Sequence, residues 1–183
     1  MNLAKTSTLD FVKIFSRAVR DLVQGSTGKP INVSKTAMQI TGIQITGAIG
    51  AFVTFSGDYS GIMVLNFEGE TALELVQDSL TRMGLSKEDI PTHYGNDEVR
   101  NNIGEMTNQI IGKCRTMVQD IYDLSARANI PAVVPITVPV ALSMVAKEPR
   151  DLECVRVSFT TAKRNKFYME LALEPILGSP MEL

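Results

Sequence analysis

The sequence predicts an α+β domain in which helices pack on one face of a largely antiparallel β-sheet. Two observations support this fold class. Apolar residues recur at helical spacing in residues 8–23, 68–83 and 97–123, whereas residues 39–67 and the last third of the chain are rich in β-branched and aromatic residues. The resulting order is helix, hairpin, helix, long helix and meander, which is typical of helices segregated to one side of a sheet.

The composition favours one globular domain spanning residues 1–183. The chain is 44% hydrophobic and 21% charged, which is too apolar for a disordered protein. Its net charge of -2 argues against nucleic acid as the main partner, because neutralising phosphates requires a basic surface. Charges interrupt the apolar run of the first twenty residues, and no stretch reaches the roughly 18 to 20 apolar residues of a membrane span. We therefore expect a cytoplasmic protein without a membrane span.

The sequence predicts neither a metal centre nor a disulfide. The two cysteines, Cys114 and Cys154, form no CxxC pair, and the single histidine, His93, has no cluster of ligand residues around it in the sequence. We expect both thiols to be reduced core residues, and we expect no metal or cofactor on this chain.

The first half of the chain should begin with an amphipathic helix, residues 8–23, which a turn at residues 25–30 ends. This GSTGKP turn lacks the GxxxxGK[ST] spacing of a phosphate-binding loop. Residues 39–67 should form an antiparallel hairpin around SGDYSG, with bends or close backbone approaches at the glycines of the first arm. A second helix at residues 68–83 should end at Gly84.

The second half should contain a polar linker, the long helix, a Pro-rich extended stretch and a meander. Alternation of apolar and polar residues is clearest in the last two of the three meander strands. The three strands are expected near residues 138–146, 152–160 and 166–174, with turns at residues 148–151 and 162–166.

The long helix, residues 97–123, carries the most informative pattern. One face should be core, because apolar residues recur at alternating steps of four and three. These residues are Val99, Ile103, Met106, Ile110, Cys114, Met117 and Ile121. At about 100° per residue, the opposite side of the helix holds a second set within roughly 60°. This outward set consists of Asn101, Glu105, Asn108 and Gly112.

The spacing Glu105-x-x-Asn108 places both side chains on adjacent turns, where their heads converge on a shared external target. This pair suits phosphoryl hydrolysis by positioning, because a carboxamide can hold a water in line with phosphorus while a carboxylate anchors a cation of the partner. The spacing alone is a weak signal, since Glu98-x-x-Asn101 also matches it.

These residues resemble the motif of the CheC/CheX/FliY family, phosphatases that act on the phosphorylated chemotaxis response regulator CheY. The family motif is Asp or Ser, x3, Glu, x2, Asn, x22, Pro, commonly with a Gly four residues after the Asn. Glu105, Asn108 and Gly112 fit this motif, and Pro131 lies 23 positions after Asn108. The resemblance extends to the GKP after the first helix, to SGDYSGIMVLNFEGETALELV and to KFYMELALEP. One departure is Asn101, where the family prefers Asp or Ser.

The resemblance implies a CheX/CheC-like fold and a mechanism. The substrate would be the aspartyl phosphate of a CheY-like receiver domain, with Mg²⁺ held by that receiver. Asn108 would orient the attacking water, and Glu105 would pair with a lysine of the receiver. Asn101, Gly112 and Pro131 would contact the partner. The first helix contains no glutamate and hence no second ExxN pair, so the chain is more similar to CheX, which implies a homodimer.

Three alternatives stay open. The first is a non-catalytic adaptor of the same fold that binds a receiver or a flagellar switch component, which the departure at Asn101 favours. The second is a small-ligand module with a pocket between helices and sheet, which has poor support because the polar residues of the long helix point outward. The third treats Glu105 and Asn108 as part of an ordinary solvated face.

Overall fold

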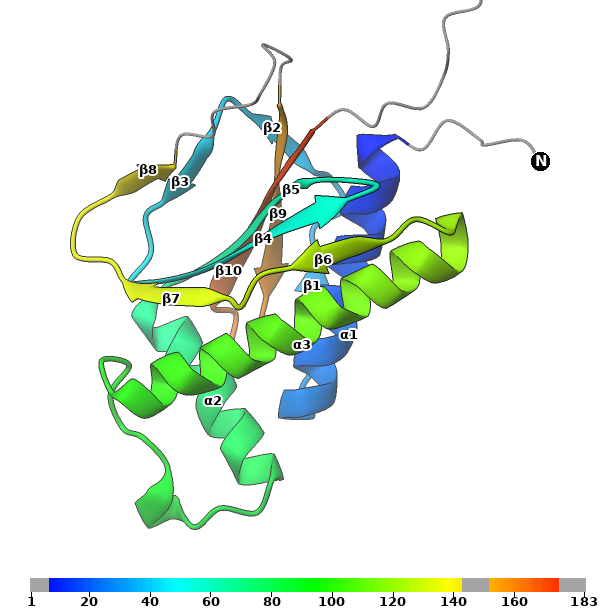
Figure 1. Ribbon diagram of the computed structural model, residues 1–183. Helices are drawn as coiled ribbons and strands as arrows, with labels where there is room; N and C mark the ends of the chain where they lie inside the picture. The colour runs from blue at the N-terminus through cyan, green and yellow to red at the C-terminus, as the bar shows by residue number, and fades with distance from the viewer. Residues whose placement is uncertain (1–6, 143–151, 175–183) are drawn as a thin grey trace, which may run out of the picture.

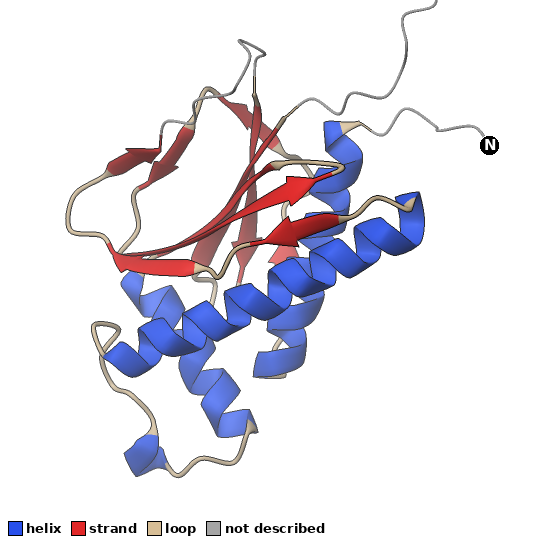
Figure 2. Ribbon diagram, viewed as in Figure 1, coloured by secondary structure: helices blue, strands red, loops and turns tan. Residues whose placement is uncertain are grey.

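Three helices lie against one face of an antiparallel β-sheet in the computed structural model, which describes residues 7–142 and 152–174 (Figure 1). The helices are α1 (Thr8–Thr27), α2 (Gly69–Arg82) and α3 (Asp97–Tyr122), with a short 3-10 helix, η1 (Lys87–Asp89), before α3. The strands are β1 (Asn32–Val33), β2 (Met38–Ile40), β3 (Ile43–Ile45), β4 (Ile49–Gly57), β5 (Gly61–Phe67), β6 (Ala126–Ala128), β7 (Ala132–Pro135), β8 (Val140–Leu142), β9 (Glu153–Thr160) and β10 (Lys166–Leu173). Figure 2 shows helices and strands in separate layers, which confirms the predicted α+β class.

The described strands form one large sheet and one small ribbon. The path through the large sheet is β1-β9-β10-β5-β4-β6, with β2 also paired to β9 and β7 also paired to β4. Strands β3 and β8 form the ribbon, which lies on the side of the sheet away from the helices (Figure 1). Every pairing among these strands is antiparallel.

The predicted hairpin exists but is shorter than expected. Strands β4 and β5 pair from Ile49 opposite Phe67 to Phe55 opposite Gly61. The residues before β4 form β2 and β3, which pair with β9 and β8 instead. Close backbone approach at a first-arm glycine is confirmed, because a Cβ on Gly47 would collide with the carbonyl oxygen of Phe67. The Ala48 N–H donates a hydrogen bond of 2.8 Å to that same oxygen.

The predicted three-strand meander is wrong for its first strand. Strand β8 pairs with β3, whereas β9 and β10 are antiparallel neighbours as predicted. Alternation identifies a strand and its buried face, but it does not name the partner strand. Residues 143–146 of the predicted strand and the predicted turn at residues 148–151 lie outside the described residues.

Helix α1 continues beyond its predicted end. It runs through Gly25 to Thr27, and Gly28 ends it in the left-handed conformation with a φ of 69°. The Gly28 N–H donates a hydrogen bond of 3.0 Å to the carbonyl oxygen of Gln24, which closes the last turn. Sequence spacing predicts the helix end at the first glycine because a helix interior disfavours glycine, but the packed helix tolerates it.

Among the described helices, none has the length and apolar character to cross a bilayer.

Apolar layers cover both faces of the central strands. The main core lies between the helices and the sheet and includes the fully buried rings of Phe11, Phe15, Phe67, Phe159 and Phe167. A smaller cluster on the other face is covered by the β3–β8 ribbon. It contains Ile43, Ile45, Ile62, Val64, Cys154 and Ala172. Strand β5 is therefore buried at every position, and the predicted single helical layer is joined by a β-ribbon on the opposite face.

Candidate functional site

Helix α3 rests on the sheet through the apolar stripe that the sequence predicts, except at its last turns. The stripe residues Val99, Ile103, Met106, Ile110 and Cys114 are buried. Met117 is half-buried, and Ile121 is 56% exposed, so the predicted core position of Ile121 is wrong. The last turn packs instead through Tyr122, whose ring stacks on Phe11 with centroids 6.2 Å apart. The stripe holds the middle of α3 at a fixed rotation, which sets the direction of its outer face.

The outer face of α3 carries the predicted polar row, here called the α3 ridge. It consists of Asn101, Glu105, Asn108 and Gly112. The three side chains are exposed and Gly112 is partly exposed. The structure thus brings these four residues together on one accessible face, as their spacing of three and four residues requires.

The side chains of the two predicted catalytic residues, Glu105 and Asn108, differ in what they contact. Glu105 Oε1 accepts a hydrogen bond of 2.9 Å from Gln109 Nε2. Within residues 7–142 and 152–174, the Asn108 carboxamide makes no side-chain hydrogen bond. Its donor and its acceptor are therefore both available to a bound molecule. A carboxamide in this state can hold a water, and a carboxylate three residues away can hold a cation.

The described fold does not itself require glycine at position 112. A Cβ on Gly112 would meet no atom within 4 Å. Gly104, which faces the sheet, is different, because a Cβ there would lie 3.3 Å from Val133 Cγ2. Glycine in a helix interior costs roughly 0.5–1 kcal/mol relative to alanine. Gly112 therefore leaves an accessible strip of backbone on the α3 ridge without any packing gain.

Pro131 lies in a segment that runs beside the α3 ridge. Arg115 Nε donates a hydrogen bond of 2.6 Å to the Ala126 carbonyl oxygen, and Val133 packs against Gly104. The chain from β6 to β7 is held at these two points, so residues 129–131 pass the middle of α3 between them (Figure 1). Pro131 is partly buried, and its neighbour Ile130 is 91% exposed. We call residues 129–131 the β6–β7 loop.

Hollows border the α3 ridge on both flanks. One, of about 450 Å³, lies between the last turns of α3 and β6, and its lining includes Gly112 and Arg115. The other, of about 370 Å³, lies where the ends of α1 and α2 meet α3, and its lining includes Glu105, Gln109 and Arg82. The ridge therefore stands above its surroundings, and a convex partner surface or a protruding side chain can reach it from either side.

The described residues offer no metal cluster or activated thiol near the ridge. No three His, Cys, Asp or Glu side chains in the described ranges gather closely enough to hold a metal ion. Both cysteines are buried free thiols, as predicted. Burial raises the pKa of Cys114, and burial followed by the nearby Glu170 carboxylate raises the pKa of Cys154. Each sulfur therefore stays protonated at neutral pH and is a poor nucleophile.

Sequence reasoning missed three residues that shape this site. Gln109 holds the Glu105 carboxylate, Arg115 ties α3 to β6, and Ile130 exposes an apolar side chain in the β6–β7 loop. The spacing of Gln109 four residues after Glu105 is a signal from which their contact is predictable. No local signal exists for the other two, because their roles depend on residues from distant elements.

Solved structures similar to this fold include CheX and CheC-like chemotaxis proteins. A CheC-like superfamily protein from Shewanella sp. PV-4 matches with a TM-score of 0.74 at 16% identity, over 92% of this chain and 99% of that one. A chemotaxis protein CheX from Desulfovibrio desulfuricans matches with a TM-score of 0.70 at 18% identity, over 90% and 99%. A chain of the CheX–CheY–BeF3–Mg²⁺ complex from Borrelia burgdorferi matches with a TM-score of 0.63 at 15% identity, over 90% and 98%. The chain therefore has the CheX/CheC-like fold that its sequence motif implied.

The sequence itself belongs to a family described as "Protein of unknown function (DUF3334)", whose model matches residues 3–176. No curated protein matches the sequence significantly.

Proposed function

We propose that this protein is a cytoplasmic phosphatase that hydrolyses the aspartyl phosphate of a CheY-like response regulator, in chemotaxis or related two-component signalling. The observation that carries the proposal is the α3 ridge, where an exposed carboxylate and an unengaged carboxamide stand three residues apart. The ridge belongs to a CheX/CheC-like fold, and one structure with that fold is a complex of CheX with CheY, BeF3 and Mg²⁺. That complex supports a CheY-like partner for this chain.

In this mechanism the chain positions a reaction that takes place on its partner. Asn108 enters the receiver's active site, where its carboxamide orients a water in line with the phosphorus. Glu105 pairs with a lysine of the receiver and fixes the register of the two proteins. The water attacks phosphorus, the bond to the aspartate oxygen breaks, and phosphate leaves while the aspartate returns to a carboxylate. Mg²⁺ belongs to the receiver and offsets the charge on the phosphoryl oxygens. No covalent intermediate forms on this chain.

The remaining predicted site residues act in docking. Gly112 lets the receiver approach the helix backbone closely, because no side chain stands there. Asn101 extends the polar ridge by one turn. In the β6–β7 loop, Pro131 stiffens the segment and Ile130 supplies apolar area at the edge of the contact. These contacts place Asn108 at the centre of the interface.

The test is the lifetime of the phosphoryl group on a cognate CheY-like receiver, with and without this protein. The wild type should shorten the lifetime, and Asn108→Ala should lose about 100-fold in rate because the water is no longer held. Glu105→Ala should lose both rate and affinity. Glu98→Ala is the matched control, because Glu98 is an exposed carboxylate on the same helix that begins the upstream ExxN pair. It should leave the rate unchanged.

Binding measurements separate the phosphatase from the adaptor. The Glu105 carboxylate is already engaged by Gln109, an arrangement that also suits a pure docking surface. If the wild type binds receivers but leaves the phosphoryl lifetime unchanged across several of them, the phosphatase proposal is wrong and the α3 ridge belongs to an adaptor.

A homodimer forms part of the same proposal. Within the described residues, β8 pairs with β3 alone. Apolar side chains are exposed at Val140 (37%), the first residue of β8, and at Val138 (66%), two residues before it. An edge of this kind is suited to pairing with a second copy. Light scattering at micromolar concentration should give the mass of a dimer, and a monomer mass would contradict this part of the proposal.

A further inference from the structure

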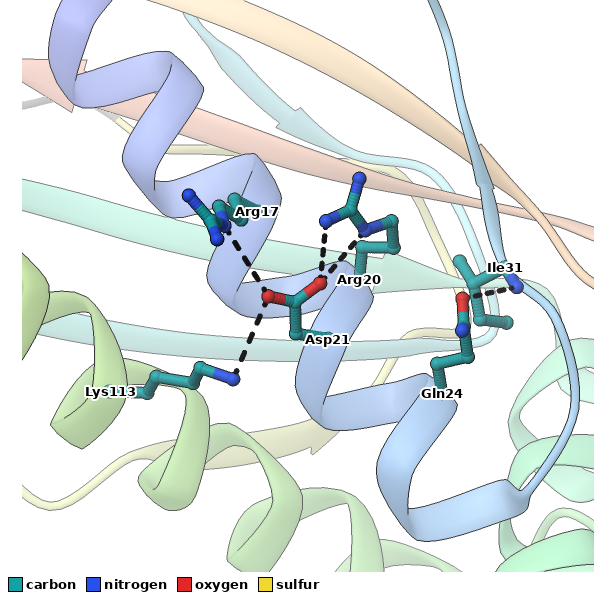
Figure 3. A network of polar contacts seen from close by, with 6 residues as sticks. All are labelled: Arg17, Arg20, Asp21, Gln24, Ile31 and Lys113. Atoms are coloured by element: carbon teal, nitrogen blue, oxygen red, sulfur yellow. Dashed lines mark hydrogen bonds and ion pairs between the residues drawn. The ribbon is translucent and has the colours of Figure 1, made fainter.

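A cluster of three cations surrounds one carboxylate between α1 and α3 (Figure 3). Arg20 donates two hydrogen bonds to Asp21 Oδ1, from Nη2 at 2.7 Å and from Nε at 2.9 Å. Arg17 Nε lies 3.6 Å from Asp21 Oδ2, and Lys113 Nζ lies 3.8 Å from the same oxygen. The first three residues belong to α1, whereas Lys113 comes from α3. We call these four residues the Asp21 cluster.

The Asp21 cluster carries more positive charge than its single carboxylate neutralises. Three cations face one carboxylate, while the whole chain has a net charge of -2. The cationic side chains are also accessible, with exposed fractions of 67% for Arg17, 42% for Arg20 and 39% for Lys113. An isolated surface ion pair contributes little to folding stability. Internal pairing therefore does not explain the two surplus positive charges.

Arg17 and Lys113 make no hydrogen bond to the carboxylate of this cluster. Asp21 binds Arg20 closely, but its distances to Arg17 Nε and Lys113 Nζ are beyond hydrogen-bond range. Asp21 thus orients the cations without saturating them. On the next turn of α1, Gln24 Oε1 accepts a hydrogen bond of 3.3 Å from the Ile31 N–H, so its carboxamide is turned away from the cluster (Figure 3).

The cluster adjoins the α3 ridge. Lys113 follows Gly112 directly in α3, on the flank of that helix that faces α1. Helices α1 and α3 are in contact, and α3 crosses α1 in Figure 1. Asn108 and Lys113 are five residues apart in α3, which is about 7.5 Å along the helix axis, so a globular partner seated on Asn108 can also reach the Asp21 cluster.

We propose that the Asp21 cluster is an electrostatic docking site for the acidic surface that surrounds the aspartyl phosphate of a receiver domain. This inference rests on the proposed function. Mg²⁺ beside a phosphorylated aspartate is held by one or two carboxylates of the protein, together with phosphate oxygens and waters, so the site is rich in negatively charged oxygens. Such a surface would be repelled by a chain of net negative charge unless a local basic patch faced it. Arg17, Arg20 and Lys113 supply that patch beside the catalytic residues, where they accelerate encounter and set its orientation.

The test is the ionic-strength dependence of receiver dephosphorylation in a triple variant, Arg17→Gln, Arg20→Gln and Lys113→Gln. At low salt the variant should lose about tenfold in kcat/KM, with kcat at saturating receiver unchanged. The fall of kcat/KM with rising salt should also be shallower than in the wild type. The control is Lys163→Gln, an exposed lysine in the β9–β10 turn beside Asp78 of α2, which should behave as the wild type. Equal salt dependence in the triple variant and the wild type would overturn the inference.

Two further measurements keep this inference separate from the proposed function. If the wild type hydrolyses nothing, the salt dependence of its Kd for a BeF3-loaded receiver still tests the docking site, and the triple variant should lose that dependence. Sedimentation with vesicles of anionic phosphatidylglycerol tests a lipid surface as the occupant. Vesicle binding by the wild type that the triple variant loses, together with unchanged receiver kinetics, would assign the cluster to membranes and refute the inference.

Discussion

Gln109 Nε2 donates a hydrogen bond of 2.9 Å to Glu105 Oε1 across one turn of α3. The two side chains also line the same hollow where the ends of α1 and α2 meet α3. This contact holds the Glu105 carboxylate on the α1 side of the α3 ridge, while Asn108 stays unengaged among the described residues. Gln109 is therefore a positioning residue for Glu105, the carboxylate of the proposed catalytic pair.

Replacing Gln109 with Met should lower receiver dephosphorylation without destabilising the fold. Met keeps the length of the side chain but cannot donate the hydrogen bond, so kcat/KM should fall about fivefold, the equivalent of a bond worth about 1 kcal/mol. Because Gln109 is exposed, the free energy of unfolding in urea should stay within about 0.5 kcal/mol of the wild type. Gln119→Met is the matched control, since Gln119 makes the same kind of bond to Asp123 farther along α3. Equal kcat/KM values for Gln109→Met and Gln119→Met would show that Gln109 has no positioning role.

Gly112→Ala should separate stability from activity. The new Cβ meets open space, so the helix gains about 0.5–1 kcal/mol in unfolding free energy. The same methyl group should obstruct the receiver and raise KM for dephosphorylation several-fold. Gly104→Ala is the paired control on the inner side, where the Cβ lies 3.3 Å from Val133 and the stability gain should be smaller. A Gly112→Ala protein that is stabilised and fully active would show that the partner does not approach this strip of backbone.

Tyr59→Phe should leave the protein at least as stable as the wild type. The hydroxyl of Tyr59 is buried and has no hydrogen-bond partner among the described residues, so its removal relieves a cost of about 1 kcal/mol. The ring remains to pack on Phe11 and Phe55, at centroid distances of 5.0 and 5.6 Å. Chemical denaturation at pH 7 measures the change, and a clear loss of stability would show that the hydroxyl has a partner of its own.

The same tyrosine predicts a loss of stability at alkaline pH. Burial, with a smaller effect from nearby Cys114, raises the pKa of Tyr59 to about 12. In the unfolded chain this group ionises near pH 10, so between about pH 10 and 12 the unfolded state releases a proton that the folded state retains. Unfolding free energy should therefore fall across this window. The advantage of Tyr59→Phe over the wild type should widen there, and a constant difference would contradict the assignment.

Arg156 lies on the face of the sheet opposite the helices. Arg156→Met should destabilise the protein strongly. Glu170 is fully buried and is held by Arg156, with an Nη2–Oε1 distance of 2.6 Å, and by the Gln44 N–H at 3.0 Å. Removing the guanidinium leaves a buried carboxylate without its cation, which should cost about 3 kcal/mol in urea unfolding. The double variant Arg156→Met with Glu170→Gln should recover part of this loss. If the double variant is less stable than Arg156→Met alone, the uncompensated charge is not the cause.

The helices and their outward residues were predictable because they follow from local spacing. Apolar residues at steps of three and four locate the buried side of α3, and the ridge from Asn101 to Gly112 is the necessary complement. The predictions from local spacing were wrong where contacts with distant residues decide the structure. Ile121 keeps the apolar spacing but is exposed, because Tyr122 provides the contact of the last turn by stacking on Phe11. Gly25 suggested a helix end, but the helix continued to Gly28, which adopts the left-handed conformation.

The sequence by itself determined the α+β class, the long helix and the row of Asn101, Glu105, Asn108 and Gly112, since a helix turns by about 100° per residue whatever surrounds it. Only the tertiary structure decided that β3 pairs with β8 and that the β6–β7 loop runs beside the ridge. It also decided that Lys113 joins Arg17 and Arg20 around Asp21. These features depend on contacts between residues far apart in the chain, and no local pattern of side chains encodes which distant segments will meet.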